Sequence, residues 1–208
     1  IWKGEGSEPV IAAAVEGGGQ DLDVTIRIAD PVSGSVQKST AGITSALFGT
    51  VTGSLSLNAT YFFTGTRKGL EATPDATGNV GLLANTVANG VFTVKSVDFS
   101  NQVVSGGTVK ATNGNAGLLV GAVSDGASLC VGSLSDVPTL INVPTATVES
   151  SNGCAGGVVG VVGKVGSSAG ATVEVASAID LSNLTVKGAA AAGGFIGQAT
   201  KLTLAQAE

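Results

Sequence analysis

Residues 156–162 of this chain read Gly-Gly-Val-Val-Gly-Val-Val, with pairs of bulky aliphatic residues set between glycines. A related block, in which two bulky apolar residues follow a small residue, occurs five times along the sequence. The copies begin at residues 46, 81, 117, 157 and 194, which gives spacings of 35, 36, 40 and 37 residues. Near-constant spacing in this range is typical of solenoid proteins, in which each repeat forms one structural unit.

The segments between these blocks alternate apolar and polar residues, which predicts β-strands with one buried face. Asn89-Gly90, Asn113-Gly114 and Asn152-Gly153 lie between such segments and predict turns with a positive φ at glycine. The only helix candidates are two short alanine runs, at residues 12–14 and 189–192. The strands are expected around Val24–Ile28, Leu55–Leu57, Phe92–Val94, Leu129–Val131, Val173–Val175 and Leu202–Leu204.

Together these patterns predict an all-β fold, a parallel β-solenoid (β-helix) with irregular repeats of 35–40 residues. The aliphatic pairs near residues 47, 82, 118, 158 and 195 are expected to line one interior column. Each repeat forms either one coil with a protruding loop or two short coils, and both readings stay open. Residues 1–40 are more acidic and are expected to form an N-terminal cap or strand segment, and residues 41–208 the repeat region.

The composition fits a narrow core. Of the 208 residues 43% are hydrophobic but only 4% are aromatic, so the core must consist of Val, Leu, Ile and Ala. The chain has 32 glycines, and only 12% of its residues are charged, about half the usual share. Serine, threonine, asparagine and glycine are therefore expected to cover much of the surface.

The absence of histidine excludes several classes of site. Without it, the chain cannot hold a Ser-His-Asp or Cys-His nucleophile system or a His-ligated metal. A net charge of −5 with only two arginines, Arg27 and Arg67, argues against nucleic-acid binding. We expect no catalytic residues, no metal and no cofactor.

The apolar stretches at residues 155–162 and 188–197 are much shorter than the roughly 18 residues that span a bilayer, so we expect a soluble chain without membrane insertion. The chain opens Ile-Trp-Lys, which suggests a mature or excised segment.

Two features favour an oxidising, extracellular compartment. Cys130 and Cys154 form an even count in a chain of low charge, which favours a disulfide. Their separation of 24 residues is close to one coil of about 20 to 25 residues, so the bond would join neighbouring coils. The alternative is two buried free thiols. Asn58 and Asn183 each begin an Asn-x-Thr triplet and are candidate glycosylation sites.

The blocks GGVVGVV and GGFIGQA, the latter preceded by IDLSNLTVKG, resemble the Gly-Gly-Leu-Val-Gly type (GLUG) repeats of secreted and cell-surface β-helical proteins. Such proteins include bacterial adhesins and some protist surface proteins. The resemblance covers roughly residues 41–208 and is clearest in the fourth and fifth blocks. It implies a parallel β-helix on a surface protein, and it implies no shared ligand.

Candidate binding chemistry is sparse. Asp21 and Asp23 lie two residues apart on a predicted strand, where they are either calcium ligands or part of a solvated strand edge. A glycan platform would need surface aromatics, and Tyr61, Phe62 and the nearby Arg67 are the candidate contacts. The alternative is that the aromatic cluster at residues 61–63 belongs to the core or to an interface. The acidic residues are scattered, unlike the clustered carboxylates of a polysaccharide-degrading β-helical enzyme.

These observations predict an extracellular structural module: a stalk, a surface coat or a filament subunit. Its partners would be neighbouring domains or subunits that contact the ends of the solenoid. The alternative is an adhesin domain that binds a glycan or a host surface, and a polysaccharide-degrading enzyme ranks third. We therefore expect the chain not to be an enzyme.

Overall fold

The computed structural model describes residues 11–28, 46–63, 71–72, 78–99, 108–132, 139–141, 143, 145–164, 169–176, 178–200 and 202–206. Within these ranges the chain forms strands and no helix. The strands are β1 (Ala12–Ile28), β2 (Phe48–Phe63), β3 (Glu71–Ala72), β4 (Ala84–Val87), β5 (Gly90–Asp98), β6 (Thr108–Ala111), β7 (Ala116–Gly117), β8 (Val120–Val123), β9 (Ala127–Val131), β10 (Leu140–Ile141), β11 (Ala146–Ser150), β12 (Cys154–Gly156), β13 (Val159–Val162), β14 (Ala171–Val175), β15 (Leu184–Gly188), β16 (Ala191–Gly193), β17 (Ile196–Ala199) and β18 (Leu202–Gln206).

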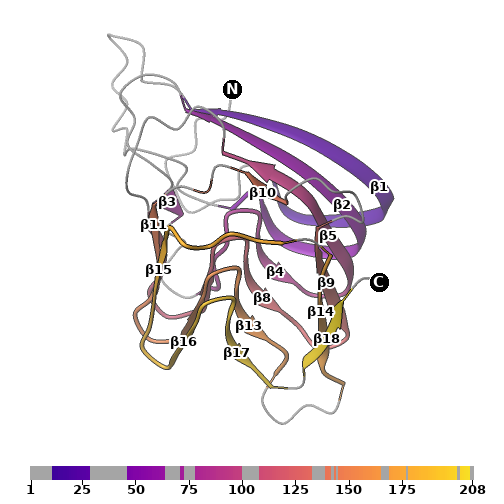
Figure 1. Cartoon of the computed structure of the whole chain (residues 1–208). Coiled ribbons are helices and arrows are strands. Elements are labelled where there is room, and N and C mark those ends of the chain that lie inside the picture. The colour runs from indigo at the N-terminus through magenta and orange to yellow at the C-terminus, as the bar shows by residue number, and fades with distance from the viewer. Residues whose placement is uncertain are drawn as a thin grey trace.

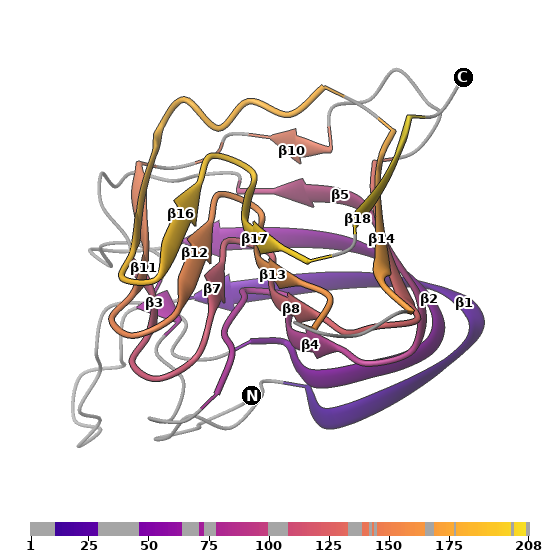
Figure 2. The same ribbon diagram turned by 90° about the horizontal axis from the view of Figure 1, so that it is seen from below.

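The strands stack into a parallel β-solenoid (Figure 1). One sheet runs β17-β13-β8-β4-β2-β5-β9-β14-β18, with β1 on β2 and β10 on β5. A second sheet has the order β15-β11-β6-β3, and a third β16-β12-β7. A full coil visits the second sheet, then the third, then both halves of the first, as β15, β16, β17 and β18 do. Figure 2, which looks along the stack, shows this path.

One repeat is one coil. Phe48 pairs with Ala84, which pairs with Val120, and this column continues through Val159 to Ile196. The repeats are about 37 residues apart, so the reading of one coil per repeat is confirmed over two short coils.

The aliphatic pairs lie in the interior, as predicted. Leu47, Leu83, Leu119 and Val158 are all completely buried and belong to one hydrophobic core. Backbone hydrogen bonds hold their register, for example from Leu47 N to the Leu82 carbonyl at 3.0 Å. Phe195, in the last coil, is only partly buried. The prediction of a common interior column is therefore confirmed.

The Gly-x-x-x-Gly spacing of the repeat has a steric cause. Between β12 and β13 the chain folds inward, so that a Cβ on Gly156 would overlap the Val159 carbonyl oxygen. A Cβ on Gly160 would lie 2.8 Å from the backbone of Ala116 in the preceding coil. Gly193 and Gly197 repeat these two contacts one coil later. Only glycine fits both sides of this inward fold, because real Cβ atoms do not approach the backbone so closely.

The positive φ predicted for the glycine of three Asn-Gly pairs is found in one of them and is wrong for the other two. Gly90 has the expected positive φ of 79°, at the corner between the two halves of the first sheet. Gly114 and Gly153 do not have a positive φ. Both positions need glycine because these turns stack closely on the turns of the preceding coil. A Cβ on Gly114 would overlap the Gly78 carbonyl oxygen, and a Cβ on Gly153 would overlap the Gly114 carbonyl oxygen.

The N-terminal segment contributes a strand to the solenoid. β1 pairs in parallel with β2 along its whole length. The predicted boundary at residues 40 and 41 lies outside the described residues. Both alanine runs take part in strands, β1 and β16, instead of helices. No helix in the described part of the chain is long and apolar enough to cross a membrane.

Candidate functional site

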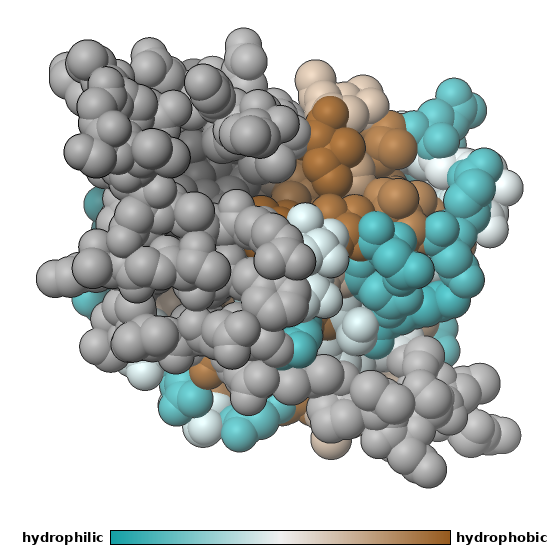
Figure 3. All heavy atoms as spheres, turned by 90° about the horizontal axis from the view of Figure 1, so that it is seen from above, coloured by the Kyte–Doolittle hydropathy of each residue, from teal (hydrophilic) through white to brown (hydrophobic). Residues whose placement is uncertain are grey.

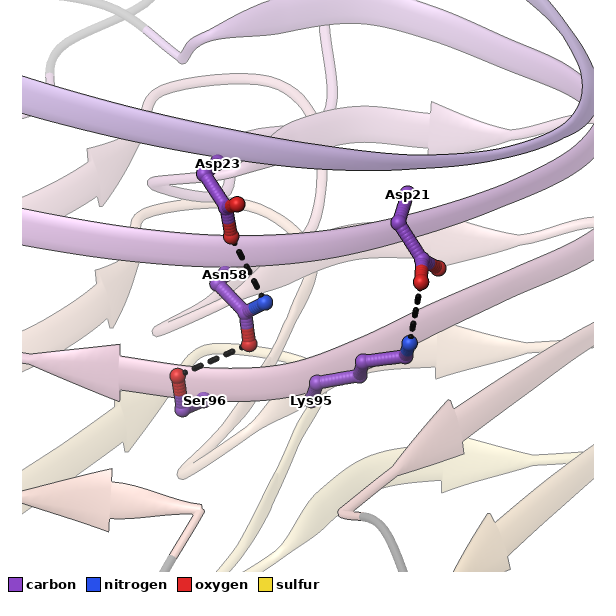
Figure 4. A network of polar contacts seen from close by, with 5 residues as sticks. All are labelled: Asp21, Asp23, Asn58, Lys95 and Ser96. Atoms are coloured by element: carbon purple, nitrogen blue, oxygen red, sulfur yellow. Dashed lines mark hydrogen bonds and ion pairs between the residues drawn. The ribbon is translucent and has the colours of Figure 1, made fainter.

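Polar side chains gather on the outer face of β1, β2 and β5 (Figure 4). The Lys95 ammonium forms an ion pair with the Asp21 carboxylate at 2.7 Å. Asn58 donates its side-chain N–H to Asp23 at 2.8 Å and accepts the Ser96 hydroxyl at 3.0 Å. The hydrogen bond from Lys95 lowers the pKa of Asp21. This network links three successive coils.

The network bears on the calcium hypothesis. Asp21 and Asp23 lie on the same face, as the sequence indicates, but Asp23 engages Asn58 in the adjacent coil and Asp21 engages Lys95 two coils away. No group of three or more His, Cys, Asp or Glu residues suited to a metal ion occurs in the described ranges. The geometry therefore matches a solvated strand edge stabilised by cross-strand pairs.

A second network lies on the outer face of the β15-β11-β6-β3 sheet. Lys110, Glu149 and Lys187 occupy the same position in three successive coils. Lys110 and Glu149 form an ion pair at 2.8 Å. The Lys110 hydrogen bond lowers the pKa of Glu149, and the charge of Lys187 adds to this effect. Sequence reasoning missed this column because the charge changes sign from coil to coil and the repeats do not share one residue type at this position.

A third network joins the turns before the third sheet. The Asn115 side chain donates to Asn79 Oδ1 at 2.8 Å, and its own Oδ1 accepts the backbone N–H of Cys154 at 3.0 Å. Asn152 donates to Asn113 Oδ1 at 2.8 Å. Asn113 and Asn152 were singled out from the sequence only as turn residues, and Asn79 and Asn115 were missed. Alignment of the repeats would have found them, because each pairs with an asparagine one coil away.

Tyr61 was a candidate glycan contact, with the protein core or an interface as the alternative, and it lies in the core. Its side chain is completely buried. The ring stacks on that of Phe99 with centroids 5.5 Å apart, and its hydroxyl lies 3.5 Å from the Leu82 carbonyl oxygen. Tyr61 fills the core because its position continues the inward alternation of Leu57 and Ala59. The Phe62 side chain and Arg67 lie outside the described part of the structure.

The predicted disulfide is also wrong, because Cys130 and Cys154 are free thiols. A coil has about 37 residues, so cysteines 24 residues apart fall on different columns. Cys130 lies on β9 between Thr93 and Glu174. Cys154 lies on β12, where its thiol donates to Gln198 Oε1 at 3.1 Å. Burial raises the pKa of both thiols.

The two candidate glycosylation sites lie in different settings. Asn58 is half-buried within β2 and belongs to the first network. Asn183 is exposed in the turn before β15, where it donates to the Val143 carbonyl at 3.1 Å. Glycosylation at both positions remains a prediction, and Asn183 has the more accessible side chain.

No protein-family model, curated protein or solved structure matches this chain. The sequence and geometry therefore establish the β-solenoid and identify no family.

Proposed function

We propose that this chain is a structural module of an extracellular or surface-exposed assembly, in which the solenoid acts as a stalk, coat or filament unit. One observation carries the proposal: the prominent polar side chains pair with side chains of neighbouring coils. Adjacent coils are joined in this way by the contacts Lys110–Glu149, Asn79–Asn115 and Asp23–Asn58. Side chains used in this way stabilise the stack, whereas a catalytic site needs them to converge around a substrate.

The core supports a rigid, load-bearing role. Its columns of small and medium aliphatic residues run through the stack, from Val51 through Val87 and Val123 to Val162. Interior packing of this kind is dense and of low compressibility. A rod of stacked coils therefore suits a scaffold.

The surface location rests on the resemblance of the repeat blocks to those of secreted and cell-surface β-helical proteins. The low share of charged residues, 12%, is consistent with it. Glycosylation at Asn183 would fit the same compartment.

Immunogold electron microscopy of source cells tests the proposal. An antibody against the folded chain is expected to label intact, unpermeabilised cells in ordered surface structures. Label that appears only after permeabilisation would contradict it. A glycan array run with the same protein separates the scaffold from the adhesin, because a scaffold gives no defined glycan signal.

A further inference from the structure

The last coil leaves one edge of every sheet without a described neighbour. β15, β16 and β17 each stand at the end of their sheet order, and they face the viewer in Figure 2. We call their free edges the C-terminal edge. Val186, Phe195 and Ile196 are only partly buried there, whereas the equivalent residues Val148, Val158 and Val159 in the preceding coil are completely buried.

The C-terminal edge repeats a surface that already binds a coil inside the molecule. The coil of β6 to β8 presents Thr108, Val109 and Lys110 to β11. The last coil carries Thr185, Val186 and Lys187 at the same three positions. Further along, Gly193 and Gly197 stand where the earlier coil has Gly117 and Gly121. The glycine contacts of the inward fold are thus also preserved.

The alternating charges on the outer face of the second sheet indicate which charged residue a further strand would carry. The column runs Lys110, Glu149, Lys187, which is positive, negative, positive. Lys187 is exposed and has no ion pair of its own among the described residues. A carboxylate in a further strand would continue the alternation and neutralise it, as Glu149 does for Lys110.

The opposite end of the stack is built differently. β1 has a bulge between Gly18 and Gln20, and the Gln20 side chain accepts the Gly18 backbone N–H at 2.7 Å. Bulges and charged side chains are common devices that block pairing at an edge strand, and Glu16, Asp21 and Asp23 are exposed on β1. Figure 3 shows this face from above, with hydrophilic residues beside hydrophobic ones in its described part.

We propose that the C-terminal edge is a docking site for one β-coil supplied by a partner protein. The partner segment has a Ser or Thr, an aliphatic residue and an Asp or Glu in succession, followed by a glycine-rich turn and an aliphatic strand. It adds in parallel, with its carboxylate beside Lys187. This inference rests on the proposed function, since it names the neighbour that a structural module joins at its end.

A peptide of residues 145–163 is a suitable probe, because it is the coil that binds the equivalent internal edge. Fluorescence anisotropy measures its binding to the full chain. We expect saturable binding that weakens at least tenfold when the peptide carries Glu149→Lys. The Lys187→Glu chain is expected to reverse this preference, binding the Glu149→Lys peptide better than the unmodified one.

The Lys164→Glu chain is the matched control, because Lys164 is an exposed lysine after β13 and lies outside the charge column. It is expected to bind like the unmodified chain, and circular dichroism checks that both variants are folded. Absence of binding to the unmodified folded chain would overturn the proposal. So would binding that ignores both charge reversals or equals that of a scrambled peptide. Surface labelling in the immunogold experiment is independent of these results, so the two proposals fail separately.

Discussion

Gly160 lies beside Gly121 of the preceding coil, so close that a Cβ on Gly160 would contact the Gly121 carbonyl oxygen at 2.5 Å. The same Cβ would lie 2.8 Å from the backbone of Ala116. The obstructing atoms belong to the backbone, so a larger residue forces neighbouring coils apart. The second glycine of the repeat is therefore a packing requirement of the stack.

We predict that Gly160→Ala destabilises the chain by about 1–3 kcal/mol or more, as overpacking of dense cores does. Gly194→Ala is the matched control, because a Cβ at Gly194 has no atom within 4 Å and its φ is not positive. It should change the free energy of unfolding by less than about 1 kcal/mol. Urea unfolding followed by circular dichroism measures both variants. Equal stability of the two would disprove the steric explanation.

The cysteines give a second prediction. Because Cys130 and Cys154 occupy different columns, the unfolded chain should show two reactive thiols without added reductant. Cys130→Ser should change stability by no more than about 0.5 kcal/mol, since it removes no cross-link. Loss of a native disulfide would cost about 2–5 kcal/mol. Ellman's reagent in denaturant counts the free thiols. A count below two would show that the cysteines are oxidised and would contradict this prediction.

The sequence predicted the features that recur in every coil. The aliphatic pairs around Leu47 and Leu119 and the alternating strands were visible because the same physical requirement repeats about every 37 residues. The prediction of a disulfide was wrong because it assumed a coil of about 20 to 25 residues. The sequence left Tyr61 open between a glycan contact and the core, because only the strand register places it beside Phe99 in the core.

The polar networks needed the register as well. Lys110 and Glu149 have opposite charges, so comparison of the repeats by similarity hides their relation. Once β6 and β11 are paired, the two side chains must be neighbours. Residue identity alone thus fixed the interior columns, whereas the exposed columns depended on knowing which residues face each other.

The Lys110–Glu149 pair predicts a dependence of stability on pH. The pKa of Glu149 is lower in the folded chain, so its contribution is present above the unfolded-state pKa of about 4.3 and is lost as the pH falls through the folded-state value. Both side chains are substantially exposed, so the pair should contribute less than about 1 kcal/mol and weaken with salt.

A double-mutant cycle of Glu149→Gln and Lys110→Gln measures this contribution. Urea unfolding at pH 7 and at pH 3, each at low and high salt, should show a coupling energy at pH 7 and low salt that disappears at pH 3. A coupling energy that is the same under all four conditions would contradict the electrostatic origin.

Tyr61 gives a sharper test, because it is the only tyrosine of the chain. Burial raises its pKa well above the usual value of about 10. The stability that this group contributes is fully present below the unfolded-state pKa. As the pH rises above that value, the unfolded chain ionises first, and the contribution is lost.

Ultraviolet absorbance of tyrosinate should therefore appear only together with unfolding measured by circular dichroism. Tyr61→Phe, which keeps the ring against Phe99, should unfold at higher pH than the unmodified chain. Ionisation of Tyr61 near pH 10 in a fully folded chain would show that its hydroxyl reaches water.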